Sequence, residues 1–414
     1  MLYIVSQYYS PVQNAPANRL NILVKTLSSA SSKFNFEIVT GMPNYPYGKL
    51  MPKYKGKLYL HEIGQYDETI HHLFEIPAEN KGFFKKTIGY ISFSISVFNF
   101  FLFKRISKDD IIFVSSPPVF QVYSLYFLSF IKKFRLVLDI RDIWPESIVP
   151  LGFLKEKSFF YRFFLALSIR VYKRSEYMIG VTPGIVKYVE GICPGSKVHF
   201  ISNQVDVSLF HPLSPGEITE FKNENPDVFK KKYTVLFSGT IAAYVDLLTM
   251  MKAINIVKEK YRDFSFIVIG HGEEKEKLEN YCRKNKLDEL VKFLPYMDRS
   301  KLNKYISAAD FCYYTLMDAE AFNVAIPTKT LEYLACNKFL IASAEGEYPE
   351  ELEQHKIAVT APPGNSKKLA EVLIKVFNDE ILWANKSLPR EYVSNNFSSE
   401  KFQKEVLGFF DRIT

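Results

Sequence analysis

Two stretches of this sequence contain charged residues at spacings that could support catalysis or the binding of an anion. The first stretch follows an apolar run. It contains Arg141 and Asp142, within residues 139–147, which hold two further acids. A carboxylate such as that of Asp142 can orient an acceptor hydroxyl, and the guanidinium of Arg141 can hold an anion. A buried structural pair of an aspartate and an arginine is the alternative. We predict that Arg141 and Asp142 take part in catalysis.

The second stretch begins at Pro327, which suits the first turn of a helix. Thr328, Lys329 and Thr330 follow it. Backbone N–H groups, the helix dipole and the Lys329 ammonium would form a phosphate site at such a helix start. Glu332, one turn on, would reach the vicinal hydroxyls of a ribose. Ordinary capping by Thr328, with Lys329 and Glu332 in solvent, is the alternative for this segment taken alone.

A glycine turn at Gly270 and Gly272 lies between an apolar run and a helical pattern. Only two glycines are present, so the dinucleotide-binding fingerprint is incomplete. The turn permits close approach of the backbone to a ligand, or a tight strand-to-helix connection without one. Both interpretations stay open.

A polar segment with Asn14, Asn18 and Arg19 follows the first apolar run, and an amphipathic helix follows to about residue 31. These side chains can hydrogen-bond a sugar or a phosphate, and Arg19 can do so in bidentate geometry. We expect them to bind the acceptor. A solvated loop in which Arg19 pairs with an acid is the alternative.

Short β-branched runs alternate with helical stretches along the whole chain, which predicts an α/β protein with doubly wound parallel sheets. The rhythm restarts after residue 205, so we expect two similar Rossmann-like units. The expected strands are residues 2–5, 37–40, 111–115, 136–139, 178–181 and 198–202, then 234–238, 264–269, 291–294, 311–314, 339–342 and 358–360.

The chain length of 414 residues and the hydrophobic content of 47% fit two domains, each with its own core. Residues 203–216 lack periodicity and contain Pro212 and Pro215, so we place the hinge there. We expect domains at residues 1–203 and 204–388, and a segment at 389–414 whose helix packs back on the first domain. Ligands of such folds bind at the carboxyl ends of the strands, so we expect the site in a cleft that the two domains face.

The composition of the chain limits the ligands, metal sites and cellular compartment that we expect. The net charge of +8 suits an anionic ligand or surface, and nucleic acid is only a weak possibility. The four cysteines are far apart, which favours reduced thiols in the cytoplasm. The sequence has no HExxH and no His/Cys cluster, so we expect no metal site. The first residues lack the features of an export signal, so we expect a cytoplasmic protein.

One apolar segment at residues 84–102 has basic residues at both ends: Lys81, Lys85, Lys86, Lys104 and Arg105. Its apolar residues step by four and three, which predicts one helix. The uncharged run is too short and too rich in serine for a good bilayer span. We expect an inner face packed on the sheet and a rim that touches anionic lipid. Similar basic aromatic runs occur at residues 127–135 and 159–174.

Six segments, taken in order, resemble family 4 glycosyltransferases, and in particular bacterial surface-polysaccharide enzymes such as fucosamine or N-acetylhexosamine transferases. They begin at Tyr8 (YYSP), Thr40 (TGMPNYPYGK), Ser115 (SSPP), Asp139 (DIRDIWPES), Val268 (VIGHG) and Pro327 (PTKTLEY). The resemblance covers nearly the whole chain. It implies a GT-B fold, with a nucleotide-sugar donor on the second domain and an acceptor on the first.

The resemblance also implies a reaction that retains the anomeric configuration, with no bound metal and no cofactor. The donor is expected to be UDP-linked, and a lipid-linked sugar acceptor in O-antigen or capsule synthesis would suit a peripheral protein on the inner face of the cytoplasmic membrane. Carried over by residue, Glu332 matches the family's ribose-binding acid, and Gly270 and Gly272 match the turn on the nucleotide side. Tyr296 belongs to the segment that flanks the base.

Two departures from the family pattern affect the donor site. Many members carry Arg and Lys after the first strand of the second domain, where this chain has Gly239 and Thr240, so Lys329 or Arg141 would have to neutralise the diphosphate. The usual pair of acids seven residues apart is also missing, and Glu320 is the nearest acid ahead of Glu332. We expect Glu320 to face the donor sugar. A nucleotide-sugar epimerase and a non-catalytic sugar-nucleotide-binding scaffold subunit remain alternatives.

Overall fold

The computed structural model describes residues 1–414 except 13, 31–32, 45–47, 78–82 and 386. The chain forms two compact units. Unit 1 comprises residues 1–203 and 402–414, and unit 2 comprises residues 204–401. Lys81 lies outside the described residues, and so do residues 45–47 of the segment that begins at Thr40.

Unit 1 contains an eight-stranded sheet with the order β3-β4-β2-β1-β5-β6-β7-β8. All neighbours are parallel except β3, which pairs antiparallel with β4. The strands are β1 (Leu2–Ser6), β2 (Phe36–Gly41), β3 (Tyr59–Ile63), β4 (Thr69–Leu73), β5 (Ile111–Ser116), β6 (Arg135–Ile140), β7 (Tyr177–Gly180) and β8 (Val198–Phe200).

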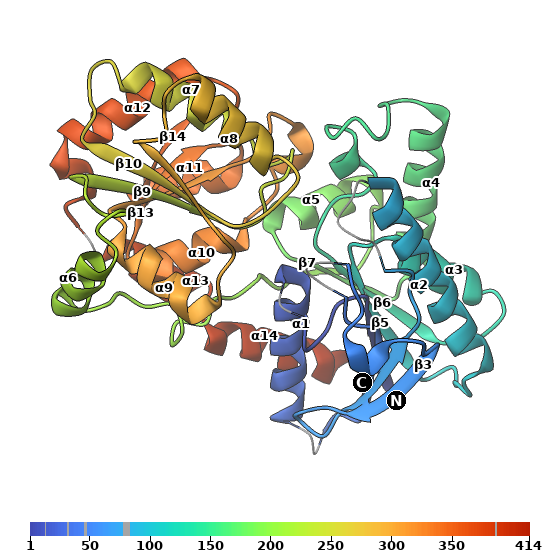
Figure 1. Cartoon of the computed structure of the whole chain (residues 1–414). Helices are drawn as coiled ribbons and strands as arrows, with labels where there is room; N and C mark the ends of the chain where they lie inside the picture. Colours follow the sequence, from blue (N-terminus) through green and yellow to red (C-terminus); the bar gives the residue numbers. More distant parts are fainter. Residues whose placement is uncertain (13, 31–32, 45–47, 78–82, 386) are drawn as a thin grey trace. The chain divides into compact units, whose positions relative to one another are not determined.

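The main helices of unit 1 cover both faces of this sheet (Figure 1). They are α1 (Ala15–Ser28), α2 (Phe83–Phe103), α3 (Phe120–Leu128), α4 (Phe159–Arg174), α5 (Pro183–Ile192) and most of α14 (Ser399–Ile413). Parallel strands are joined by right-handed crossovers, and the sheet order then puts α2, α3 and α4 on the face opposite α1. Phe402, Val406 and Phe410 of α14 are buried in the core that α1 shares with the sheet.

Unit 2 contains a six-stranded, entirely parallel sheet with the order β11-β10-β9-β12-β13-β14. Its strands are β9 (Tyr233–Ser238), β10 (Phe264–Ile269), β11 (Val291–Leu294), β12 (Phe311–Thr315), β13 (Phe339–Ser343) and β14 (Ala358–Ala361). Its helices are α6 (Pro215–Glu224), α7 (Leu247–Val257), α8 (Lys275–Lys284), α9 (Arg299–Ala308), α10 (Thr328–Ala335), α11 (Glu347–Gln354), α12 (Ser366–Asn378) and α13 (Leu388–Asn396).

The prediction of two parallel-sheet α/β units is confirmed, and each expected strand is present with its ends shifted by at most two residues. The hairpin of β3 and β4 was not predicted. Alternate residues of β3 are exposed, and its partner β4 is short and carries the polar pair His71 and His72. An edge strand of this kind lacks the continuous apolar run that marks the central strands.

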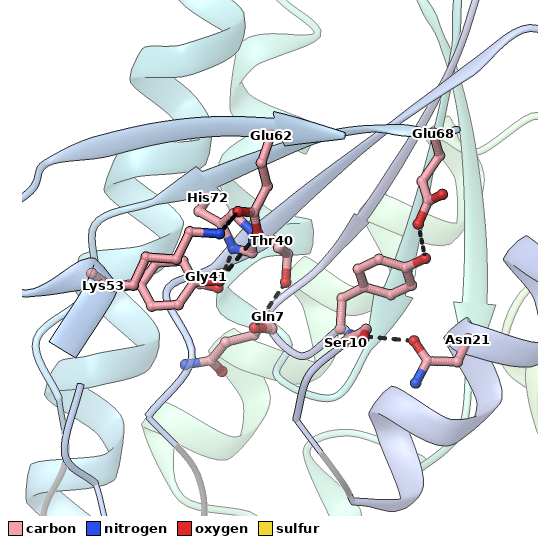
Figure 2. Close-up of polar contacts among 11 residues, drawn as sticks. Gln7, Ser10, Asn21, Thr40, Gly41, Lys53, Glu62, Glu68 and His72 are labelled. Carbon is pink, nitrogen blue, oxygen red and sulfur yellow. Dashed lines mark hydrogen bonds and ion pairs between the residues drawn. The ribbon is translucent and has the colours of Figure 1, made fainter. Parts of the chain in front are cut away.

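The hairpin is held by a polar network that includes residues of both strands (Figure 2). The buried imidazole of His72 lies with its Nε2 2.7 Å from Oε1 of Glu62, and Lys53 forms an ion pair with the same carboxylate. Burial lowers the pKa of His72, and the Glu62 hydrogen bond opposes this shift. The network therefore compensates the burial of polar groups at this edge of the sheet.

Candidate functional site

Helix α10 is fixed beside the end of β9 by one buried tyrosine. The Tyr333 hydroxyl accepts a hydrogen bond from the Ser238 backbone N–H at 2.7 Å and donates to the Ser238 carbonyl at 3.2 Å. The hydroxyls of the two residues lie 3.0 Å apart. Both side chains are buried. The first turn of α10 is thus held at the carboxyl edge of the unit 2 sheet, where ligands of doubly wound folds bind.

Lys329 points from the first turn of α10 toward the loop that follows β9. Its Nζ lies 4.1 Å from the ring centroid of Phe237, and a Cβ added to Gly239 would lie 2.9 Å from the same atom. Burial lowers the pKa of Lys329 to about 7, while the charge of Glu332 opposes the shift. A cation in this place is poorly solvated and gains much from an anionic ligand.

The start of α10 carries no side-chain cap among the residues that the structure describes. Pro327 occupies the capping position, and Thr328 begins the helix. The capping by Thr328 that offered an alternative interpretation is therefore absent. Without a capping side chain, the first N–H groups and the dipole of α10 are oriented to favour an anion.

Glu332 forms an ion pair that the sequence did not indicate. Arg299 Nη2 donates to Glu332 Oε1 at 2.9 Å, and the Arg299 guanidinium lies over the Phe210 ring at 5.0 Å. Burial raises the pKa of Glu332, and Arg299 counteracts the rise. Arg299 follows β11 at the start of α9, so its place at a strand's carboxyl end was the only sequence signal.

The two glycines after β10 allow the β9–α7 and β10–α8 loops to pack closely against each other. A Cβ added to Gly270 would lie 2.0 Å from the carbonyl oxygen of Gly239, and one added to Gly272 would lie 2.1 Å from that of Ile241. The Ile241 N–H also donates to the His271 carbonyl at 2.8 Å. The structure therefore accounts for both glycines by the close packing of the β9–α7 and β10–α8 loops.

Thr330 does not have the role that was expected for it. Its side chain is fully buried, and its Oγ1 donates to the Pro327 carbonyl at 2.7 Å and lies 2.6 Å from the Tyr348 hydroxyl. The expected donor contact through Thr330 is therefore wrong, because the side chain faces the interior of unit 2. Sequence spacing placed it at the helix start but did not show which way it points.

Three other expected donor-side residues are exposed. Thr240 lies in the loop after β9, and Glu320 begins a short 3-10 turn (Glu320–Phe322) between β12 and α10. The ring of Tyr296, after β11, meets the ring of His271 edge to face at 5.7 Å. Tyr296 and the β10–α8 turn thus form one surface at the carboxyl edge of the sheet.

In unit 1, Arg141 and Asp142 follow β6 directly, as expected. Arg141 Nη2 donates to the Pro117 carbonyl at 2.6 Å, which anchors it to the loop after β5. Its Nε is buried and has no hydrogen-bond partner within the described part of the chain. The Asp142 side chain is exposed. The two residues therefore differ: one is anchored by the protein, and the other is accessible to a substrate.

Arg19 requires a correction. Helix α1 already begins at Ala15, so Asn18 and Arg19 lie in its first turns, and Asn14 caps it by accepting from the Ala17 N–H at 2.9 Å. The buried Arg19 donates to Asp139. All its guanidinium nitrogens are engaged inside unit 1, so the expected acceptor contact through Arg19 is wrong and the alternative, pairing with an acid, holds.

A buried acid after β4 was missed by the sequence reasoning. Glu75 is 3% exposed; Gln7, after β1, donates to its Oε2 at 2.7 Å, and Asn44 donates to its Oε1. Burial raises the pKa of Glu75 to about 8, against the effect of both amide donors. Figure 2 shows Gln7 beside Thr40, whose Oγ1 donates to the Gln7 carbonyl. This cluster fixes the loops at the carboxyl ends of β1, β2 and β4.

Within the described ranges, no group of three or more His, Cys, Asp or Glu side chains lies in an arrangement that could hold a metal ion. The four cysteines are buried and form no disulfide.

Comparison with known proteins places unit 2 in a family. Residues 218–396 match the family model described as glycosyl transferases group 1. Unit 2 carries a glycosyltransferase domain of this group. The matched residues include Lys329, Glu332 and Arg299, so the site described above lies within the glycosyltransferase domain.

Curated relatives extend the similarity beyond unit 2. The chain is 26% identical over 344 residues to the probable glycosyltransferase WbjE of Pseudomonas aeruginosa, covering 80% of this chain and 82% of the relative. It is 22% identical over 165 residues to the amylovoran biosynthesis glycosyltransferase AmsK of Erwinia amylovora, covering 40% of each.

Solved structures confirm the predicted fold class. HepE of Anabaena, solved in complex with UDP, matches with a TM-score of 0.70 at 14% identity, covering 99% of both chains. The two Rossmann-like units of the present chain have the GT-B fold. At this identity the similarity extends to the fold alone.

Proposed function

We propose that the protein is a retaining glycosyltransferase that transfers a sugar from a UDP-linked donor to a lipid-linked acceptor in surface-polysaccharide synthesis. The single observation that carries the proposal is the arrangement of Lys329, Glu332 and Arg299 at the uncapped start of α10, within the glycosyltransferase domain. The similarity to AmsK, which is named for amylovoran biosynthesis, supports the pathway class, and the UDP complex of HepE supports the donor.

The donor diphosphate is proposed to bind at the first turn of α10. The loop after β9, residues 238–246, has neither Arg nor Lys. Lys329 approaches that loop at Gly239 and supplies the missing positive charge. Glu332 accepts hydrogen bonds from the ribose hydroxyls, and its ion pair with Arg299 favours the ionised form that accepts them. Tyr296 is proposed to lie beside the base.

The chemistry requires two opposite charges to be stabilised at once. As the sugar leaves the diphosphate, its ring becomes positive and the phosphate becomes more negative. Lys329 and the start of α10 stabilise the phosphate. The exposed carboxylate of Asp142 orients the acceptor hydroxyl, Arg141 holds the acceptor loop, and Glu320 faces the donor sugar. Attack on the leaving-group side retains configuration without a covalent nucleophile, and neither a metal nor a cofactor takes part.

The donor sugar is proposed to be an N-acetylated hexosamine or deoxyhexosamine, on the basis of the sequence resemblance. The acceptor is proposed to be lipid-linked, with the protein peripheral on the inner face of the cytoplasmic membrane. Unit 1 would bind the acceptor through Asp142 and the α1 start at Asn14 and Asn18, and Glu75 would keep the neighbouring loops in place.

The test is incubation of the purified full chain with UDP-linked sugars, with and without a lipid-linked sugar acceptor. We expect a new glycolipid and free UDP only when both substrates are present, and no loss of rate in EDTA. Conversion of the donor alone to an epimer would favour an epimerase, and UDP binding without turnover would favour a scaffold. Either result contradicts the proposal.

A further inference from the structure

The outward surface of α2, α3 and α4 has an unusual composition. These three helices contain no aspartate or glutamate, whereas α4 alone carries Arg162, Arg170, Lys173 and Arg174. Further basic residues follow α2 and α3 directly. The three helices therefore carry positive charge without the acidic residues that a typical solvated helix face carries, and of the flanking basic residues Lys104 pairs with Glu37.

The same surface exposes large aromatic side chains. Six of the eight phenylalanines that are exposed in the described part of the chain lie on these helices or in the turn after α3, and Phe103 (83%) and Phe159 (77%) are the most exposed. The six are Phe103, Phe127, Phe130, Phe159, Phe160 and Phe163. Exposed aromatic residues gathered on one side of a domain indicate an interaction surface. We call this outward surface of α2, α3 and α4 the lipid face.

The three helices form one continuous face. Figure 1 shows them side by side, and hydrogen bonds join their ends. The Lys132 ammonium, after α3, donates to the Lys104 carbonyl at the end of α2 at 2.7 Å. Arg174 Nη2, at the end of α4, donates to the Ser129 carbonyl after α3 at 3.2 Å. These contacts join the ends of the three helices into one surface.

Helix α2 is apolar enough to enter a membrane, but its packing in unit 1 suits a position at the membrane surface and not across the bilayer. By length and composition, residues 85–103 are apolar enough to span a membrane. However, Phe93, Val97 and Phe101 are buried within unit 1, while Ile88 and Ile95 are exposed on the outward side. A helix that is packed on a sheet along one side can bury only its other side in lipid, as interfacial helices do.

We propose that the lipid face docks unit 1 on an anionic lipid bilayer, with the aromatic side chains inserted among the headgroups and the basic residues against anionic lipid. Charge complementarity favours an anionic bilayer as the partner, because the three helices contain no acidic residue that anionic lipid would repel. The inference deepens the proposed function. It rests on that function in one respect, since docking would bring the enzyme to a lipid-linked acceptor.

Vesicle sedimentation without any substrate tests the docking. The wild type should bind vesicles of phosphatidylcholine mixed with phosphatidylglycerol, and bind phosphatidylcholine alone far less. Each basic residue near an anionic surface changes partitioning by about fivefold. The triple variant K133E/R170E/K173E should therefore lose at least tenfold in binding to anionic vesicles. Its matched control is K252E/K260E/K367E, with the same charge change at exposed positions of unit 2, which should bind like the wild type.

A second pair of variants tests insertion. F159S/F163S should weaken binding to anionic vesicles severalfold without a charge change, whereas the control F200S/I381S, which changes exposed apolar residues elsewhere, should not. Equal binding of the wild type to both vesicle types, no binding to either, or equal losses in controls and variants would overturn the docking proposal.

Circular dichroism and thermal unfolding show whether the variants are folded, and calorimetry shows whether each keeps the wild-type affinity for UDP. Vesicle binding and sugar transfer are measured in separate assays, so either proposal can fail without the other. A protein that binds anionic vesicles as described but transfers no sugar contradicts the proposed function and leaves the lipid face established. A protein that transfers sugar to a lipid-linked acceptor but ignores anionic vesicles contradicts the lipid face alone.

Discussion

The hydroxyl of Tyr333 hydrogen-bonds three atoms of Ser238, its backbone N–H, its carbonyl and its hydroxyl. This contact joins α10 to the end of β9 and so sets the position of Lys329 relative to Gly239. Because one buried hydroxyl positions both Lys329 and Glu332, the proposed donor site should be sensitive to a substitution of Tyr333 that changes neither residue.

Tyr333→Phe should therefore lower both stability and UDP affinity. Removal of the buried hydroxyl leaves the Ser238 N–H and hydroxyl without their partner, which costs about 1–3 kcal/mol of the free energy of unfolding. Urea denaturation measures this loss, and calorimetry at a temperature where the variant is folded measures UDP binding. Wild-type affinity in a destabilised variant would show that the contact is structural only.

UDP binding should depend on pH through Lys329. Its pKa in the free protein is about 7, and a bound diphosphate raises it, so binding above pH 7 takes up a proton. Affinity should fall by up to tenfold per pH unit above pH 7. Calorimetry at pH 8 in buffers of different ionisation enthalpy measures the uptake. Lys329→Met should bind weakly with no proton uptake, and Lys252→Met, an exposed control, should behave like the wild type.

The Arg19–Asp139 ion pair should contribute to stability and not to substrate binding. Arg19→Met leaves Asp139 as an uncompensated buried charge, which typically costs about 3–5 kcal/mol. Urea denaturation should show the loss, and the folded fraction should keep its UDP affinity and its KM for the acceptor. A raised acceptor KM at unchanged stability would instead restore Arg19 to the acceptor site.

Glu75→Gln should make the protein more stable at alkaline pH. Burial raises the pKa of Glu75 from 4.5 to about 8, so folding favours the protonated form and the native state loses about 1.4 kcal/mol of stability per pH unit across that range. The variant should match the wild type near pH 5 and exceed it at pH 8. Glu190→Gln, at an exposed position, should show no such pH-dependent difference. A constant difference at all pH values would contradict the protonated Glu75.

The fold was largely predictable because parallel strands buried on both faces read as continuous apolar runs, as the first four residues of β5 and of β13 do. The β3–β4 hairpin was not, since its stability comes from a polar network between side chains such as Glu62 and His72 rather than from an apolar pattern.

In the site, Lys329 and Glu332 could be predicted from the chemistry of a helix start. The partners of the charged residues could not. Arg19 and its partner Asp139 are 120 residues apart, and Arg299 and Glu332 are 33 apart, so only packing brings them together. The burial of Thr330 likewise depends on which side of α10 faces the core.

The central claim is that two sets of residues contribute to one transfer reaction in different ways. The proposed donor site of unit 2 binds the donor, and Asp142 of unit 1 acts on the acceptor. Its most direct measurement is transfer to a lipid-linked acceptor alongside UDP affinity, for Asp142→Asn and for Glu332→Ala. We predict that Asp142→Asn lowers kcat about 100-fold with wild-type UDP affinity, and that Glu332→Ala weakens UDP binding about tenfold or more. Wild-type transfer by Asp142→Asn, together with unchanged UDP affinity in Glu332→Ala, would contradict the account.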